Sequence, residues 1–168
     1  MPDILKVSNI QRRFGGLKAV DDVSFSVARG DILGLIGPNG AGKTTLFNLL
    51  VGLYASQGGR IELEGEDVSG LRPHQIAARG MTKTFQNVAL FPEMTVLDNV
   101  LVGGLLRHDV PRARQVARDN LDRVGLSAIA AKPAGELSFP EQARVELARA
   151  LCTCLLYTSP SPRDKRQS

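Results

Sequence analysis

Residues 32–50 read ILGLIGPNGAGKTTLFNLL, and this stretch decides the fold of the 168-residue chain. The apolar run over residues 32–36 predicts a short strand covered on both faces, and residues 45–50 predict an apolar helix. Between them, residues 37–44 fit the pattern G-x-x-x-x-G-K-[S/T]. A strand, a glycine-rich loop and a helix in this order predict an α/β fold with a phosphate-binding loop.

The loop is expected to bind phosphate groups through its main chain. Glycines let the backbone wrap so tightly that successive N–H groups point inward, and the helix N-terminus adds partial positive charge. Lys43 is predicted to reach the β- and γ-phosphates, and the Thr44 hydroxyl to bind Mg²⁺. A glycine turn that contains a lysine by chance is the alternative, and the flanking strand and helix argue against it. The residues predicted to hold the nucleotide here are Gly37, Pro38, Asn39, Gly40, Ala41, Gly42, Lys43, Thr44 and Thr45.

The segments around the loop predict a small antiparallel sheet followed by helices. Apolar and polar residues alternate over 5–10, 23–27 and 61–63, which is typical of half-buried strands. Later apolar residues recur at helical spacing, and one such stripe is closed by Gly125. Helices are predicted over residues 73–79, 95–107, 113–124 and 141–152.

Charge and composition exclude several classes of protein. Lys and Arg number 21 and Asp and Glu 17, and the resulting net charge of +4 is too small an excess to indicate a nucleic-acid partner. No apolar stretch reaches the length of about 18 residues needed to span a membrane, and Asp3 stands where a signal peptide carries positive charge. Cys152 and Cys154 are too few for a disulfide framework, as in a reducing compartment. We therefore expect the chain to begin in the cytoplasm.

Residues 154–168 read CLLYTSPSPRDKRQS, with no hydrophobic period that could join a core. Codons that encode residues 154–164 resemble a transposon-type sequencing adapter, so we interpret the segment as an artefact. A disordered basic tail is the alternative. The natural sequence is accordingly expected to be interrupted near Thr153.

The order of motifs resembles the ATPase subunit of ATP-binding cassette (ABC) transporters. The resemblance covers residues 5–153 and rests on Phe14-Gly15-Gly16 before the loop, Thr84-Phe85-Gln86 after it, and Leu137-Ser138 before a helix. It implies a P-loop NTPase fold with an N-terminal antiparallel β part and a helical subdomain. The implied divisions are residues 1–86 for the β part and P-loop core, 87–140 for the helical subdomain and 141–153 for the signature helix.

The resemblance also implies roles for single residues, with ATP and Mg²⁺ as the ligands. An aromatic at the position of Phe14 stacks on adenine, and Val20 lines the same face; plain core packing of Phe14 is the alternative. Gln86 stands where the family has a glutamine that contacts Mg²⁺ and the attacking water. Ser138 stands where a serine closes over the γ-phosphate held by the opposite subunit.

The signature segment departs from the family's common form, Leu-Ser-Gly-Gly-Gln. Here residues 137–141 read LSFPE, and Pro140 has no N–H to offer an anion. One backbone donor is therefore lost, while Ser138 and the helix N-terminus remain candidate phosphate contacts. Ser138 and Glu141 also have the spacing of an ordinary helix capping box, so Ser138 could be both cap and ligand.

Residues 76–87 and 90–103 look most like the branch that imports branched-chain amino acids. The resemblance then implies a peripheral subunit on the cytoplasmic face of the plasma membrane. Its partners are integral membrane permease subunits and a second ATPase subunit, in a homodimer or heterodimer. Open alternatives are importers of amides, urea or aromatic acids, a soluble cassette ATPase in translation or repair, and a small-molecule kinase.

The family also uses an apolar strand that ends in Asp-Glu, beyond the signature helix, and this chain ends first. We therefore expect an incomplete core sheet, weak nucleotide binding and negligible hydrolysis by the 168 residues alone. The missing strand would lie beside residues 32–36, which predicts an exposed apolar edge and poor solubility.

Overall fold

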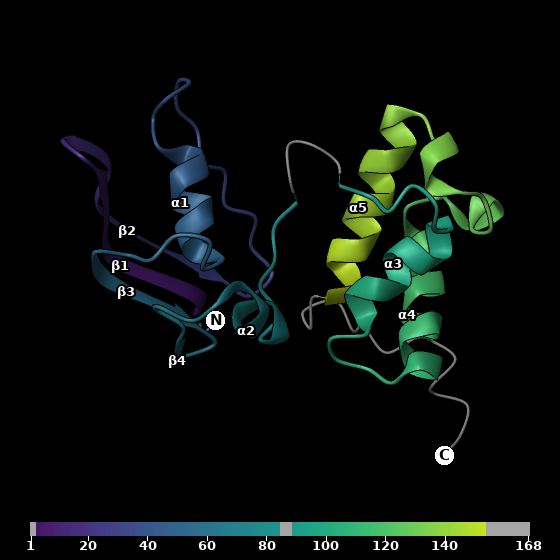
Figure 1. Ribbon diagram of the computed structural model, residues 1–168. Coiled ribbons are helices and arrows are strands. Elements are labelled where there is room, and N and C mark those ends of the chain that lie inside the picture. The colour runs from purple at the N-terminus through teal and green to yellow at the C-terminus, as the bar shows by residue number, and fades with distance from the viewer. Residues whose placement is uncertain (1–2, 85–88, 154–168) are drawn as a thin grey trace, which may run out of the picture. The chain divides into compact units, whose positions relative to one another are not determined.

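The computed structural model describes residues 3–84 and 89–153, which fall into two compact units (Figure 1). The first unit is Met1–Met81 and the second is Thr82–Ser168. The division lies at Met81, ahead of the boundary predicted at residue 86. Each unit contains a hydrophobic cluster of its own. Gln86 and the whole of residues 154–168 lie outside the described residues.

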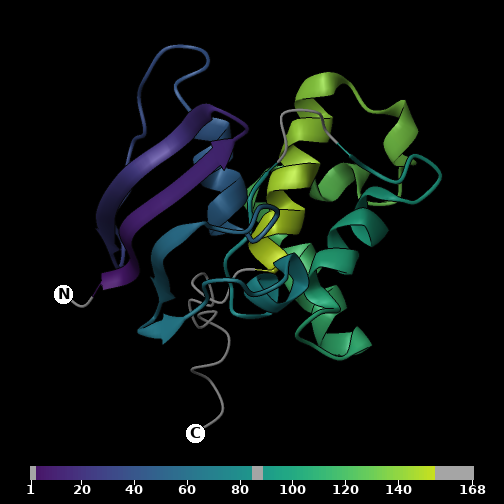
Figure 2. The ribbon, with the colours of Figure 1, turned by 60° about the vertical axis from the view of Figure 1, so that its left-hand side comes forward.

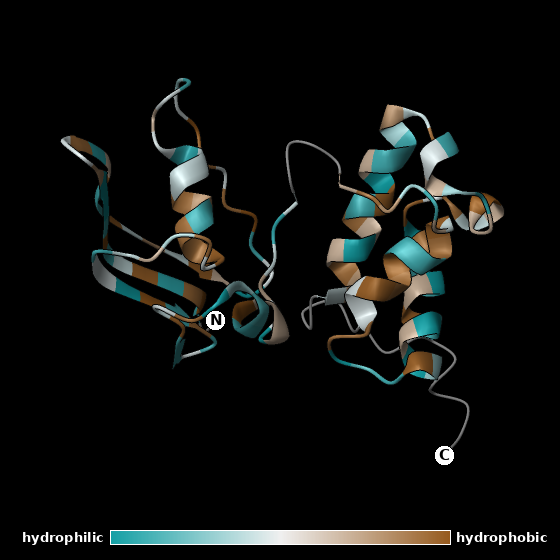
Figure 3. Cartoon of the chain, viewed as in Figure 1, coloured by the Kyte–Doolittle hydropathy of each residue, from teal (hydrophilic) through white to brown (hydrophobic). Residues whose placement is uncertain are grey.

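The first unit contains a four-stranded antiparallel sheet, as predicted, in the order β2-β1-β3-β4. In the central strand Val7 lies opposite Phe25 on one side and Ile61 on the other. Hydrophobic and hydrophilic residues alternate along the strands in Figure 3, which is the pattern of a sheet with one covered face. The strands are β1 Asp3–Phe14, β2 Leu17–Ala28, β3 Gly58–Leu63 and β4 Glu66–Asp67.

Helix α1, Lys43–Leu50, packs on one face of this sheet (Figures 1 and 2). Its buried residues Leu46, Leu49 and Leu50 join the strand residues in one cluster. Helix α2, Pro73–Ala78, adds the fully buried Ile76 to the same cluster. The packing of α1 fixes where the glycine-rich loop that precedes it must lie.

The predicted strand over residues 32–36 is wrong. Residues 31–42 lie outside any helix or strand, and Ile32 and Ile36 are 99% and 95% exposed. An apolar strand of this kind needs a neighbouring strand for its hydrogen bonds and cover for its side chains. Among the described residues no strand pairs with this run. The apolar pattern predicted a covered strand, but within the described residues no neighbouring strand covers the run and its side chains are exposed.

The described part of the second unit is helical, as predicted. Its helices are α3 Val96–Gly104, α4 Val110–Arg123 and α5 Phe139–Thr153, with short 3-10 turns η1 Ser127–Ile129 and η2 Ala134–Glu136. Thr95 and Asp109 begin α3 and α4, because the side chain of each accepts a hydrogen bond from a backbone N–H of the first turn.

Helices α3 and α5 approach each other closely at Gly103. A Cβ at this position would lie 2.3 Å from the carbonyl oxygen of Arg149 in α5, so the contact requires glycine. Across residues 3–84 and 89–153, none of the helices has the length and apolar character needed to cross a membrane.

Candidate nucleotide-binding site

The glycine-rich loop turns the chain sharply before α1. Gly40 and Gly42 have φ angles of 82° and 80°, which other residues adopt only with strain. Between them, the Ala41 N–H donates to the Pro38 carbonyl oxygen at 3.3 Å. Of the three glycines predicted in the loop, Gly40 and Gly42 therefore stand where the backbone requires glycine.

The start of α1 rests directly on strand β2. A Cβ built on Gly42 would lie 2.1 Å from the Ala19 carbonyl oxygen and 3.7 Å from Cγ2 of Val20. The helix ladder begins with the bond from Leu46 N–H to the Gly42 carbonyl oxygen at 2.8 Å. The N–H groups of residues 43–45 are left outside the ladder, and the first turn has no acidic residue. This arrangement suits a bound anion.

Lys43 folds back over the loop. Its ammonium donates to the carbonyl oxygens of Gly37 at 2.5 Å and Pro38 at 2.6 Å. The positive charge is therefore held above the loop and beside the N-terminus of α1. Phosphate oxygens arriving here can replace the two carbonyl oxygens as acceptors, and a hydrogen bond between two charged groups is the stronger one.

The metal ligands predicted were Thr44 and Gln86. Thr44 is exposed in the first turn of α1, where its hydroxyl offers the kind of oxygen ligand that Mg²⁺ prefers. Gln86 lies outside the described residues. Within the described part of the chain, no three or more His, Cys, Asp or Glu side chains are grouped to hold a metal. Mg²⁺ usually takes few protein ligands and completes its shell with phosphate and water, so a single hydroxyl fits it.

Phe14 ends strand β1 and is 40% exposed as a residue, which argues against the alternative that it is plain core. Its predicted contact with adenine stays a prediction. Val20, predicted to line the same face, is buried in the cluster beneath the sheet and supports Gly42. Its contact with adenine also stays a prediction.

Ser138 and Glu141 form the carboxylate half of the predicted capping box at the start of α5, in which the Glu141 side chain accepts from the Ser138 backbone N–H. The Ser138 N–H donates to Oε2 of Glu141 at 2.8 Å, and the Ser138 hydroxyl donates to the same oxygen at 2.6 Å. The hydrogen bonds from the Ser138 hydroxyl and N–H lower the pKa of Glu141. Helix α5 starts at Phe139, so Pro140 stands in the first turn, where its missing N–H costs the helix nothing. Ser138 is exposed, and its role as a phosphate ligand stays a prediction.

Two neighbours of Phe14 were missed by the sequence analysis. The Arg12 guanidinium and the Tyr54 ring both contact the Phe14 ring. Arg12 could have been found, because residues two apart on a strand point to the same face. Tyr54 is distant in sequence, and its position depends on how α1 packs on the sheet.

The sheet, the loop and α1 define a P-loop nucleotide-binding protein. The family model for "ABC transporter" matches residues 20–155, and the chain belongs to this family. It is 43% identical, over 166 residues, to the high-affinity branched-chain amino acid transport ATP-binding proteins BraF of Pseudomonas aeruginosa and LivG of Salmonella typhimurium. In each case 89% of this chain is covered and 65% of the relative.

A solved structure shares the fold. It is the ADP conformation of MJ1267, an ATP-binding cassette of an ABC transporter, with a TM-score of 0.79 and 35% sequence identity. The alignment covers 91% of this chain and 66% of that one. The chain thus spans about two thirds of the length of the proteins it matches.

Proposed function

We propose that the chain is the ATP-binding part of a subunit that couples ATP binding and hydrolysis to the import of branched-chain amino acids. The observation that carries the proposal is the position of Lys43. Its ammonium lies over the glycine-rich loop, next to the N-terminus of α1. The N–H groups of residues 43–45 at that N-terminus make no hydrogen bond within the helix. The amino-acid cargo is supported by the names of BraF and LivG.

The residues of the loop act by positioning and by charge. Lys43 exchanges its loop carbonyl partners for oxygens of the β- and γ-phosphates, and the amides of residues 43–45 hold the phosphates at the N-terminus of α1. Thr44 and Gln86 would hold Mg²⁺, which when bound supplies positive charge that neutralises the phosphate oxygens. Gln86 orients the attacking water, and Ser138 contacts the γ-phosphate held by a second ATPase subunit.

The proposal includes partners and a location. The subunit works as a homodimer or heterodimer at the cytoplasmic face of the plasma membrane, with integral membrane permease subunits. Support comes from relatives named as transport ATP-binding proteins. Co-purification of the longer gene product with membrane subunits tests this, and its absence would favour a cassette ATPase with no role in transport.

The 168 residues alone are proposed to bind nucleotide weakly and to turn it over at a negligible rate. They contain no Asp-Glu pair to hold Mg²⁺ and polarise the attacking water. Loss of such carboxylates costs several kcal/mol of barrier, or roughly three decades of rate. Phosphate release above the rate without protein would contradict this part of the proposal.

Titration calorimetry with Mg·ATP tests the binding site itself. We expect heat from the chain and a loss of affinity of about tenfold or more in Lys43→Ala, since a hydrogen bond to a charged group contributes about 1.5–3 kcal/mol. Lys18→Ala is the matched control, because Lys18 is exposed and pairs with Asp21 at 2.8 Å. Nucleotide binding at the loop is wrong if the chain gives no heat, or if Lys43→Ala binds as tightly as the parent.

A further inference from the structure

A cation and two aromatic rings meet at the end of strand β1. The guanidinium carbon of Arg12 lies 4.8 Å from the centre of the Phe14 ring and 5.7 Å from that of Tyr54. The two ring centres are 5.4 Å apart, with their planes at 76°. These distances and this edge-to-face geometry are those of attractive cation–π and aromatic contacts.

Arg12 is held in place rather than extended into solvent. Its Nη1 donates to the Ala55 carbonyl oxygen at 2.9 Å. Its Nε is buried and has no hydrogen-bond partner among the residues the structure describes. Burying an unpaired N–H is unfavourable, so packing of the guanidinium against the rings must offset that cost. The planar guanidinium of Arg12 is therefore held against the Phe14 ring.

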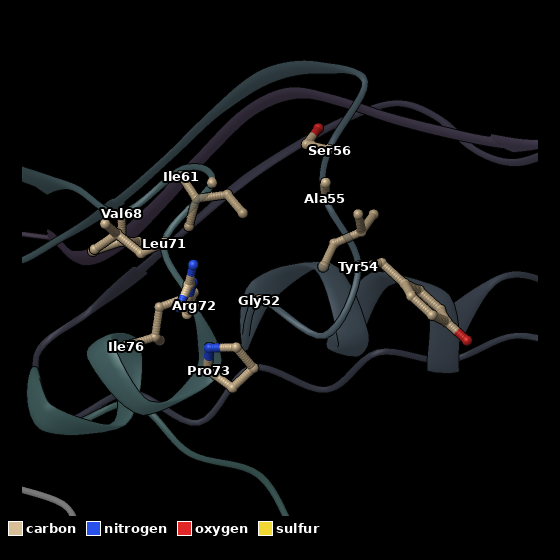
Figure 4. A pocket seen from close by; sticks show the side chains of 12 residues that line it. Gly52, Tyr54, Ala55, Ser56, Ile61, Val68, Leu71, Arg72, Pro73 and Ile76 are labelled. Atoms are coloured by element: carbon tan, nitrogen blue, oxygen red, sulfur yellow. The ribbon is translucent and has the colours of Figure 1, made fainter.

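Tyr54 reaches Phe14 from the far end of α1. Its backbone N–H donates to the Asn48 carbonyl oxygen at 3.1 Å, which fixes the turn that follows the helix. A small pocket lies nearby, lined mainly by apolar residues such as Ile61, Val68 and Ile76. In Figure 4 the Tyr54 ring projects away from these side chains. Tyr54 is thus directed outward, where its ring meets the edge of Phe14.

The hairpin of β1 and β2 contains both Phe14 and the residues on which the glycine-rich loop packs. Strand β1 pairs with β2 so that Phe14 lies opposite Leu17 and Arg12 opposite Val20. Gly42 packs on the Ala19–Val20 segment of β2. One β-hairpin therefore links the exposed Phe14 ring to the phosphate-binding loop.

We infer that Arg12 and Tyr54 are positioning residues for the base of the bound nucleotide. The Arg12 guanidinium and the Tyr54 ring both contact the Phe14 ring, and Phe14 as a residue remains 40% exposed, which leaves room for a purine base to stack on it. The inference rests on the proposed function. Since Arg12 and Tyr54 act on the base, their removal should weaken binding of a complete nucleotide. Binding of a phosphate chain that carries no base should be unchanged.

Calorimetry with two probes tests this on the 168-residue chain: Mg·ATP, and Mg²⁺ with inorganic triphosphate. In Arg12→Met we expect affinity for ATP to fall about two- to fivefold, as loss of a partly exposed cation–π contact predicts, with no change for triphosphate. Tyr54→Leu should act in the same direction, and Tyr54→Phe should restore the parent value. Arg13→Met is the matched control, since Arg13 is exposed and carries the same charge.

The ratio of the two affinities separates the outcomes. A lower ratio of ATP to triphosphate affinity in Arg12→Met and Tyr54→Leu, but not in Tyr54→Phe or Arg13→Met, supports the inference. An unchanged ratio in a parent chain that binds both probes overturns it and leaves the proposed function standing; equal loss of both probes, from misfolding or lost charge, also overturns it. If the parent binds neither probe, the proposed function itself is wrong.

Discussion

The side chain of Asn99 closes a ring with the backbone of Phe91. Its Oδ1 accepts from the Phe91 N–H at 2.8 Å, and its Nδ2 donates to the Phe91 carbonyl oxygen at 3.0 Å. The same Nδ2 reaches the carbonyl oxygens of Met94 at 3.3 Å and Thr95 at 3.0 Å. Asn99 is fully buried in α3, so one amide satisfies the turn that leads into this helix.

We expect Asn99→Ala to destabilise the second unit by about 2–4 kcal/mol, because it removes the four hydrogen bonds of a fully buried side chain and leaves the Phe91 N–H without its acceptor. Asn120→Ala is the matched control. Asn120 is also buried, but its Nδ2 donates to the Val116 carbonyl oxygen and to Sγ of Cys152, and its Oδ1 has no partner among the described residues. Urea unfolding followed by helix circular dichroism measures both variants, and equal losses would contradict the role of Asn99.

Gly42→Ala is expected to disrupt the first unit more than Gly40→Ala. Both glycines have a left-handed backbone, which costs other residues about 1–2 kcal/mol. Only Gly42 adds a clash, since its Cβ would meet the Ala19 carbonyl oxygen, whereas nothing lies within 4 Å of a Cβ at Gly40. The difference in free energy of unfolding between the two variants measures the contact between α1 and β2. Equal stability would mean that the loop moves away from β2 at no cost.

The pKa of Glu141 is held below its ordinary value, first by the Ser138 hydroxyl and then by the Ser138 N–H. A lowered folded pKa means that the capping contact stabilises α5 above the pKa of the unfolded chain. The contribution is lost as the pH falls through the folded value. Ser138→Ala should raise the pKa of Glu141 toward its ordinary value in a carbon-13 NMR titration.

Asp67 provides the control within the same spectrum. Its pKa is lowered by hydrogen bonds from the side chain and N–H of Ser69, in the other unit. Ser138→Ala should leave Asp67 unchanged, while Ser69→Ala should raise it. A Glu141 pKa that does not respond to Ser138→Ala would show that the hydroxyl contact is absent in solution.

Local patterns explain why most of the fold could be predicted. Alternation around Val7, Phe25 and Ile61 predicted the sheet, and helical spacing predicted α2 to α5, since both depend on residues close in sequence. The loop was predicted for the same reason. The strand over residues 32–36 failed because its stability depends on a partner strand, and a pattern within one segment carries no information about that partner.

Of the candidate site, the sequence indicated the residues of the loop but not the contacts that they make. Lys43 and the glycines follow from a motif, whereas the Arg12, Phe14 and Tyr54 cluster depends on contact between β1 and the end of α1. The carbonyl partners of Lys43 could not be foreseen either, because they depend on how the loop folds onto itself.

The exposed run over residues 32–36 leads to a last prediction, on association. Ile32 and Ile36 are almost fully exposed and contribute little buried area, so Ile32→Ser combined with Ile36→Ser should leave the melting temperature unchanged. The double variant should nevertheless scatter less light at high concentration, because an unpaired apolar segment promotes contact between chains. Ile10→Ser is the contrast: Ile10 is fully buried, so the melting temperature should fall. A lowered melting temperature in the double variant would instead show that the side chains of residues 32–36 are covered in solution.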